Sequence, residues 1–174
     1  MNYLKVVILS FFLLLNYLKA NSSDNINGIK SLLEGRYELV YWTENKIQYD
    51  YPEVAGVLVI NNNDALITMD KNMNSNKSVE LIGWGRYKIN STSFHIGWHD
   101  WKLLMIENNI KTVKKKSPWK GMREYSVSLK DDKLVLTSVT GKQSWKLDKK
   151  SLVYRDKEWG EEKDEVIRYL KRIE

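Results

Sequence analysis

The sequence has no cysteine, and only two prolines and two histidines among its 174 residues. The absence of cysteine excludes disulfide cross-links, thiolate zinc sites and a lipid anchor attached through a thioether. Two histidines alone make a zinc site improbable, so we expect no metal and no cofactor. The sequence also lacks the motifs of an activated nucleophile, a phosphate-binding glycine loop and a catalytic carboxylate pair. An apolar core and ordinary polar side chains therefore have to carry both stability and function.

Long apolar runs are also missing, except near the N-terminus. Residues 6–15 form a run broken only by Ser10, preceded by Lys5 and followed by Ala20 as a small residue suited to cleavage. A run of about ten residues is short of the roughly 20 that span a bilayer as a helix. We therefore predict a signal peptide over residues 1–20, a secreted or periplasmic protein, and no transmembrane segment after cleavage. A retained membrane anchor is the alternative.

Positive charge is in modest excess and is concentrated in one stretch. The formal net charge is +6, and it falls to +4 without residues 1–20, which hold Lys5 and Lys19 and no acid. The predicted loop over 108–121 carries Lys111, Lys114, Lys115, Lys116 and Lys120. Such a run can contact an anionic surface, here through Lys114, Lys115 and Lys116, or can simply be a solvated loop. We expect no nucleic-acid partner, because the aromatic residues lie in strand patterns and do not interleave with these lysines.

The part of the chain after residue 35 is dominated by strand patterns. Residues 37–42 and 57–60 are rich in aromatic and β-branched types, and Asn61–Asp64 and Asp131-Asp132 are typical of turns. About nine short strands with turn residues between them predict a sandwich or an up-and-down antiparallel barrel. The predicted organisation is a signal peptide over 1–20, an N-terminal segment with a short helix over 21–34, a β-barrel over 35–156 and a C-terminal helix over 157–174.

The two predicted helices rest on apolar stripes at helical spacing. Ile29, Leu32 and Leu33 form a short face before Gly35, a residue favoured just after a helix end. In the C-terminal segment, the apolar residues at 166, 167, 170 and 173 share one stripe, and acids at 161, 162 and 164 would occupy the first turn. We expect the C-terminal helix to pack on the outside of the barrel.

Several motifs resemble, in order, those of the lipocalin-like domain family. Residues 35–40, Gly-Arg-Tyr-Glu-Leu-Val, are similar to the opening strand of the family, with tyrosine in place of tryptophan. Gly83-Trp84-Gly85-Arg86-Tyr87 followed by His95 resembles the central strand and the histidine of the next strand. The segments 118–125 and 132–137 are similar to "P-x-W-x-G-x-x-R-x-Y" and "D-x-L-x-L-T", and 152–155 to "L-x-W-x-R", again with tyrosine for tryptophan. The resemblance implies a calycin-type barrel with an internal cavity, and it implies no shared reaction.

Alternation along barrel strands selects the residues that would face the lumen. We assign Arg123, Tyr125, Val127 and Leu129 inward, and interpret Arg123 as the buried anchor of an anionic ligand, as part of a structural ion pair, or as a residue at the barrel mouth. The predicted ligand-binding residues are Arg123, Tyr125, His95, Trp84, Tyr87, Tyr41 and Trp145. A late arginine packs over the aromatic residue of the first strand in lipocalins, which implies a structural contact of Arg155 with Tyr37.

The two histidines allow a catalytic alternative. His95 and His99 share one face of a strand and lie about 13 Å apart along it, too far to chelate one ion without a bend. His95 is either a general base inside the cavity, working with Tyr87, or a core histidine bonded to its neighbours.

Three functions follow from these patterns. The first is an exported barrel that binds a small, partly apolar and possibly anionic molecule. The second is a secreted barrel enzyme, an isomerase, lyase or hydrolase, using His95 with Arg123 or Tyr125. The third is a surface protein that acts through the lysine segment 111–120.

Overall fold

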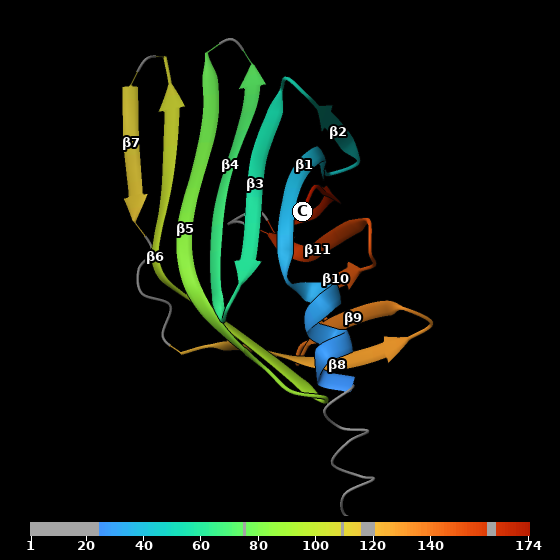
Figure 1. The fold of residues 1–174 in the computed structure, drawn as a ribbon. Helices are drawn as coiled ribbons and strands as arrows, with labels where there is room; N and C mark the ends of the chain where they lie inside the picture. The colour runs from blue at the N-terminus through green and yellow to red at the C-terminus, as the bar shows by residue number, and fades with distance from the viewer. Residues whose placement is uncertain (1–24, 75, 109, 116–120, 160–162) are drawn as a thin grey trace, which may run out of the picture.

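The computed structural model describes residues 25–74, 76–108, 110–115, 121–159 and 163–174. The predicted signal peptide over 1–20, with its cleavage point at Ala20, lies outside the described residues, as do Lys116 and Lys120. The described chain is mainly β, with one short helix over residues 25–33. Antiparallel strands follow one another around a closed barrel, and the helix lies below it (Figure 1).

Ten strands close the barrel, and two further strands branch from it. The order around the wall is β1, β3, β4, β5, β6, β8, β9, β10, β11 and β12, and pairing of β12 with β1 completes the ring. The wall strands are β1 (Gly35–Glu44), β3 (Val54–Asn61), β4 (Asp64–Asn74), β5 (Lys77–Ile89), β6 (Ser93–Glu107), β8 (Arg123–Lys130), β9 (Lys133–Ser138), β10 (Gln143–Leu147), β11 (Ser151–Trp159) and β12 (Asp164–Arg172). The branches are β2 (Ile47–Asp50), paired with β1, and β7 (Ile110–Lys115), paired with β6.

The predicted C-terminal helix is wrong, because this segment is strand β12. Val166, Arg168 and Leu170 are buried while Ile167 and Tyr169 are half-buried, which is the two-residue period of a strand. The β-branched and aromatic residues of the segment also favour a strand. Both edges of β12 are paired, with β11 and with β1, so tertiary hydrogen bonding overrides the helical spacing of its apolar residues. The barrel therefore extends to residue 172 and does not end at 156.

The predicted basic loop over 108–121 is also partly wrong. Residues 110–115 form β7, which pairs with the upper half of β6, and Ile110 and Val113 are exposed on it. β6 is long enough to serve two partners, since its first residues, Ser93–Ile96, pair with β8 instead. The predicted turns are confirmed: Asn62, Asn63, Asp131 and Asp132 have the positive φ angles that tight hairpins require.

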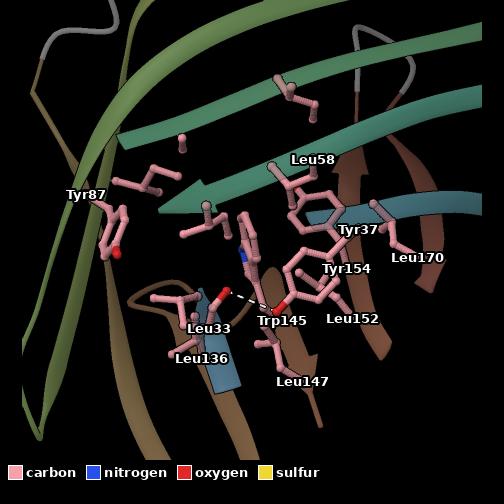
Figure 2. Close-up of a cluster of buried hydrophobic side chains, with 14 of the residues drawn as sticks. Leu33, Tyr37, Leu58, Tyr87, Leu136, Trp145, Leu147, Leu152, Tyr154 and Leu170 are labelled. Carbon is pink, nitrogen blue, oxygen red and sulfur yellow. Dashed lines mark hydrogen bonds between the residues drawn. The ribbon is translucent and has the colours of Figure 1, made fainter. Parts of the chain in front are cut away.

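The short N-terminal helix is confirmed, and it closes one end of the barrel. Ile29, Leu32 and Leu33 are buried, and the Tyr37 hydroxyl donates hydrogen bonds to the carbonyl oxygens of Leu32 (2.8 Å) and Leu33 (3.0 Å). Figure 2 shows Leu33 and Tyr37 among the buried side chains of the barrel interior. These bonds satisfy carbonyl groups that the end of a helix leaves without partners. The first strand and the helix are thus fixed to each other inside the core.

Candidate binding cavity

The barrel interior holds a cavity of about 70 Å³ above the packed aromatic cluster. Phe94 centres that cluster, with ring centroids 5.7 Å from Tyr125, 5.8 Å from Tyr87 and 6.0 Å from Trp145. The cavity walls come from most strands of the barrel: Leu58, Ile67, Met69, Leu81, Ile96, Trp98, Trp101, Arg123, Tyr125, Trp145, Leu152, Tyr154, Trp159, Arg168 and Leu170. Several of these, including Leu58, Trp145, Tyr154 and Leu170, are drawn in Figure 2.

Arg168 is the buried cation of this cavity. Its side chain is 4% exposed and points inward from β12, between Trp42 of β1 and Tyr154 of β11 in the strand register. The guanidinium carbon lies 3.9 Å from the Trp42 ring centroid, 4.3 Å from that of Trp159 and 5.4 Å from that of Tyr154. Burial lowers the pKa of Arg168 to about 10, so the group remains charged at neutral pH. Its Nε and Nη2 atoms have no hydrogen-bond acceptor among the described residues.

A chain of hydrogen bonds crosses the wall beside Arg168. The hydroxyl of Tyr125 (2.8 Å) and Nη1 of Arg123 (3.0 Å) both donate to Oε1 of Gln143. Gln143 Nε2 in turn donates to Oδ2 of the buried Asp156 (2.6 Å), which also accepts from the Tyr154 hydroxyl (2.9 Å). Burial raises the pKa of Tyr125 and of Tyr154, so both hydroxyls stay protonated and remain donors. The nearby Asp156 carboxylate partly balances the Arg168 charge without bonding to it.

A second buried cation, Lys71, lies above Trp42. Its amine forms an ion pair with Glu44 and lies 4.2 Å from the Tyr49 ring centroid and 5.4 Å from that of Trp42. The side chain is 3% exposed. Burial lowers the pKa of Lys71 to about 8, and the neighbouring Arg168 charge acts in the same direction. Unlike Arg168, this cation has an acid in direct contact.

The structure brings part of the predicted site together in the lumen. Tyr125 and Trp145 are buried and line the cavity. Arg123 lies at the edge of the cavity and is exposed, so it is not the buried anchor that strand alternation predicts. Tyr87 is buried lower down, where its hydroxyl donates to the Glu34 carboxylate. Of the expected inward face of β8, Val127 packs against the core and Leu129 is exposed.

Three predicted ligand-binding residues, His95, Trp84 and Tyr41, lie outside the lumen. His95 alternates with the buried Phe94 and Ile96 and faces outward. Trp84 is 46% exposed on the outer surface, where its ring lies 4.9 Å from that of His99. In β1 the register shifts between Leu39 and Tyr41, so the inward positions after Leu39 pass to Trp42 and Glu44. Tyr41 then stacks outside on Tyr169, with ring centroids 5.2 Å apart.

The predicted contact of Arg155 with Tyr37 is not formed. Arg155 is paired with Glu165 on the neighbouring strand. The cation nearest the Tyr37 ring is Arg172, with its guanidinium carbon 5.8 Å from the centroid. Tyr37 itself is fully buried, and burial raises its pKa to about 12. The late arginine over the first aromatic residue therefore comes from β12, the strand that the sequence pattern assigns to a helix.

Sequence reasoning misses Arg168, the cation placed deepest in the cavity. Its position follows from the strand period of β12, in which Val166 and Leu170 share its face. If residues 164–172 are interpreted as a strand, the pattern identifies Arg168 as a charged residue on an apolar face.

Among the described residues, no group of three or more histidine or acidic side chains is placed to hold a metal ion. No helix in the described ranges has the length and hydropathy needed to cross a membrane. Comparisons of the chain with protein-family models, with curated proteins and with solved structures find no match, so the resemblance to lipocalin-like domains stays a prediction.

Proposed function

We propose that the protein binds a small monocarboxylate with an apolar body inside the barrel, with Arg168 as its anchor. The observation that carries this proposal is that Arg168 lines the cavity while two of its buried donors, Nε and Nη2, have no acceptor among the described residues. Nε and Nη2 are the two donors along one side of a guanidinium, and together they form the fork that takes both oxygens of a carboxylate. Buried donors without acceptors cost about 1–3 kcal/mol each, more for a charged group, and a bound carboxylate would remove that cost.

The charges around the site favour a single negative charge on the ligand. Asp156 already balances part of the Arg168 charge, and Glu44 pairs with Lys71. A second negative charge would lie in the barrel without a partner, and burying an unpaired charge is costly. The remaining cavity wall is apolar and aromatic, which suits a short hydrocarbon body. At about 70 Å³, well below the roughly 300–1,000 Å³ of pockets for drug-sized ligands and about half of the ~150 Å³ of a cavity that binds benzene, the cavity suits a body of a few carbons. A single ring fits when lining side chains move aside.

The test compares benzoate with neutral benzamide by isothermal titration calorimetry. We expect benzoate to bind and benzamide, which has nearly the same shape, to bind at least tenfold more weakly. Arg168→Gln should weaken benzoate binding by about 10- to 100-fold, since hydrogen bonds to charged groups contribute about 1.5–3 kcal/mol. Arg155→Gln, on the adjacent strand and outside the barrel, is the matched control and should bind as the unmodified protein does. The proposal is overturned if Arg168→Gln binds benzoate as tightly as the unmodified protein does. It is also overturned if the unmodified protein binds neither benzoate nor butyrate.

The geometry gives less support to the other two functions. An enzyme using His95 would need that side chain near Arg123 or Tyr125, whereas His95 faces outward opposite Glu124 of β8. Residues 116–120 of the lysine segment 111–120 lie outside the described residues.

Membership of the lipocalin-like family and export are parts of the same proposal. A closed up-and-down barrel with an internal cavity is what the family resemblance implies, and the barrel supports it at that level. N-terminal sequencing of the protein recovered from its host tests export: we expect the chain to begin at Asn21.

A further inference from the structure

Among the described residues, the lining of the cavity is buried except at three positions. Twelve of its fifteen lining residues are buried. The other three are Arg123, which is exposed, and Trp101 and Trp159, which are half-buried. These three residues come from the start of β8, the middle of β6 and the end of β11.

Side chains are packed at the helix end of the barrel and beside Arg168 on the side of β1, β2 and β4. At the lower end, the helix over residues 25–33 inserts Ile29, Leu32 and Leu33, and Tyr37 bonds to its last turn. Above Arg168, Trp42 and Lys71 are buried under Tyr49 of β2. A ligand passing through either of these places would have to displace the packed groups.

On one side of the barrel, β6 changes partner along its length. Ser93–Ile96 pair with β8 and Lys102–Glu107 pair with β7, so residues 97–101 lie between the two ladders. Trp101 is in this interval, and β8 to β10 are short strands that leave a low rim there (Figure 1). A polar groove of about 310 Å³ lies outside the rim and shares Arg123 with the cavity.

We propose that ligands enter the barrel through its side, by a portal formed by Arg123, Trp101 and Trp159, with Arg123 attracting the anion before Arg168 holds it. The part concerning the anion rests on the carboxylate-binding function proposed above. Trp159 connects the two steps, since its ring borders the portal and lies 4.3 Å from the Arg168 guanidinium.

The two arginines then control different rate constants. An exposed charge at the rim of a site acts on the association rate and on its dependence on salt, whereas a buried partner acts on dissociation. Stopped-flow tryptophan fluorescence with benzoate separates the two. For Arg123→Gln we expect association at low salt to slow by about three- to tenfold, the difference to shrink at 0.5 M salt, and dissociation to change less than twofold.

The matched control removes the same charge at the helix end. Arg36 is exposed beside Glu174 there, so Arg36→Gln should leave both rates unchanged. Slower association in Arg36→Gln but not in Arg123→Gln would place the entrance at the helix end and overturn the portal. An effect of Arg123→Gln confined to dissociation, or no effect of either variant, would overturn it as well.

A neutral probe tests the route without any carboxylate. Apolar cavities bind xenon, and ¹²⁹Xe NMR measures its exchange. Trp101→Ala should accelerate xenon exchange several-fold, while Tyr37→Phe, which loosens the helix end, should not. Faster xenon exchange in Tyr37→Phe but not in Trp101→Ala contradicts the portal. Unchanged exchange in both variants, or no uptake of xenon by either, contradicts it as well. Trp101-dependent xenon exchange together with an absence of benzoate binding would retain the portal and reject the carboxylate function.

Discussion

At the scale of single residues, the lumen stabilises two cations in different ways. Lys71 has Glu44 in direct contact, whereas Arg168 has three aromatic rings and the more distant Asp156. Cation–π contacts stabilise a guanidinium through its faces and leave its edge available for hydrogen bonds. This difference is why we assign ligand binding to Arg168 and a structural role to Lys71.

The pKa of Lys71 predicts how stability changes with pH. Burial lowers it from 10.5 to about 8 in the folded state, with Arg168 acting in the same direction and Asp164 opposing. Between these two pH values the unfolded chain binds a proton that the folded chain has lost, so the free energy of unfolding rises with pH. We expect the unmodified protein to gain stability relative to Lys71→Met from about pH 8 to 10.

Urea denaturation of both proteins at pH 7, 8, 9 and 10 measures this difference. Lys149→Met is the control, because Lys149 is exposed and its hydrogen bond with Asp132 raises its pKa. The unmodified protein should therefore gain no stability relative to Lys149→Met between pH 8 and 10. A difference between the unmodified protein and Lys71→Met that is constant across the four pH values would show that Lys71 is not perturbed.

At the scale of elements, β5 and β6 approach so closely that the contact requires glycine. A Cβ on Gly85 would lie 2.1 Å from the Gly97 carbonyl oxygen and 2.8 Å from the Trp98 Cα atom, next to the register shift of this strand pair. Backbone atoms cannot move aside, so Gly85→Ala should destabilise the protein by about 3 kcal/mol. Gly28 lies in the helix, and a Cβ there would meet only a Leu129 methyl carbon at 3.9 Å.

Gly28→Ala should therefore stabilise the protein by about 0.5–1 kcal/mol, through the higher helix propensity of alanine. Urea denaturation of the two variants checks both signs. Equal effects of the two substitutions would contradict the close approach of β5 and β6.

The elements also show where sequence patterns suffice and where they fail. Turn chemistry and alternation predict the hairpin at Asn62-Asn63 and most wall strands, because both signals are local. The register shift after Leu39 depends on the partner strand and moves the following side chains of β1 to the other face. The shift near Trp84 leaves the alternation of β5 intact. Alternation therefore predicts the wrong side for Tyr41, whereas Trp84 faces outward within the regular alternation of β5. Residues 164–172 carry apolar side chains compatible with either period, and only pairing with β1 and β11 decides for the strand.

At the scale of the whole molecule, barrel closure and the candidate site depend on the same strand. β12 pairs with β1 over Tyr37–Glu44 and with β11 over Ser151–Trp159, and it supplies Arg168 to the cavity. Strand count and turn spacing predict a sandwich or an up-and-down barrel, and the resemblance to lipocalin-like domains favours the barrel. The site could not be predicted, since its proposed anchor lies on a strand that the sequence pattern presents as a helix.

This dependence predicts what happens when β12 is removed and then supplied separately. A chain ending at residue 162 loses Val166 and Leu170 from the core and exposes the edges of β1 and β11. We expect it to lose the near-ultraviolet circular dichroism of its packed tryptophans and its cooperative unfolding in urea. A synthetic peptide of residues 163–174 should restore both, along with benzoate binding, because it can pair with both open edges.

The peptide carrying Arg168→Gln separates closure from binding. It should restore the near-ultraviolet signal without restoring benzoate binding, since the strand still pairs but the carboxylate has lost its fork of donors. A peptide of the same composition in scrambled order is the control and should restore neither. If the shortened chain binds benzoate by itself, Arg168 is not the anchor. If the scrambled peptide restores the signal equally well, the register of β12 with β1 and β11 is not what closes the barrel.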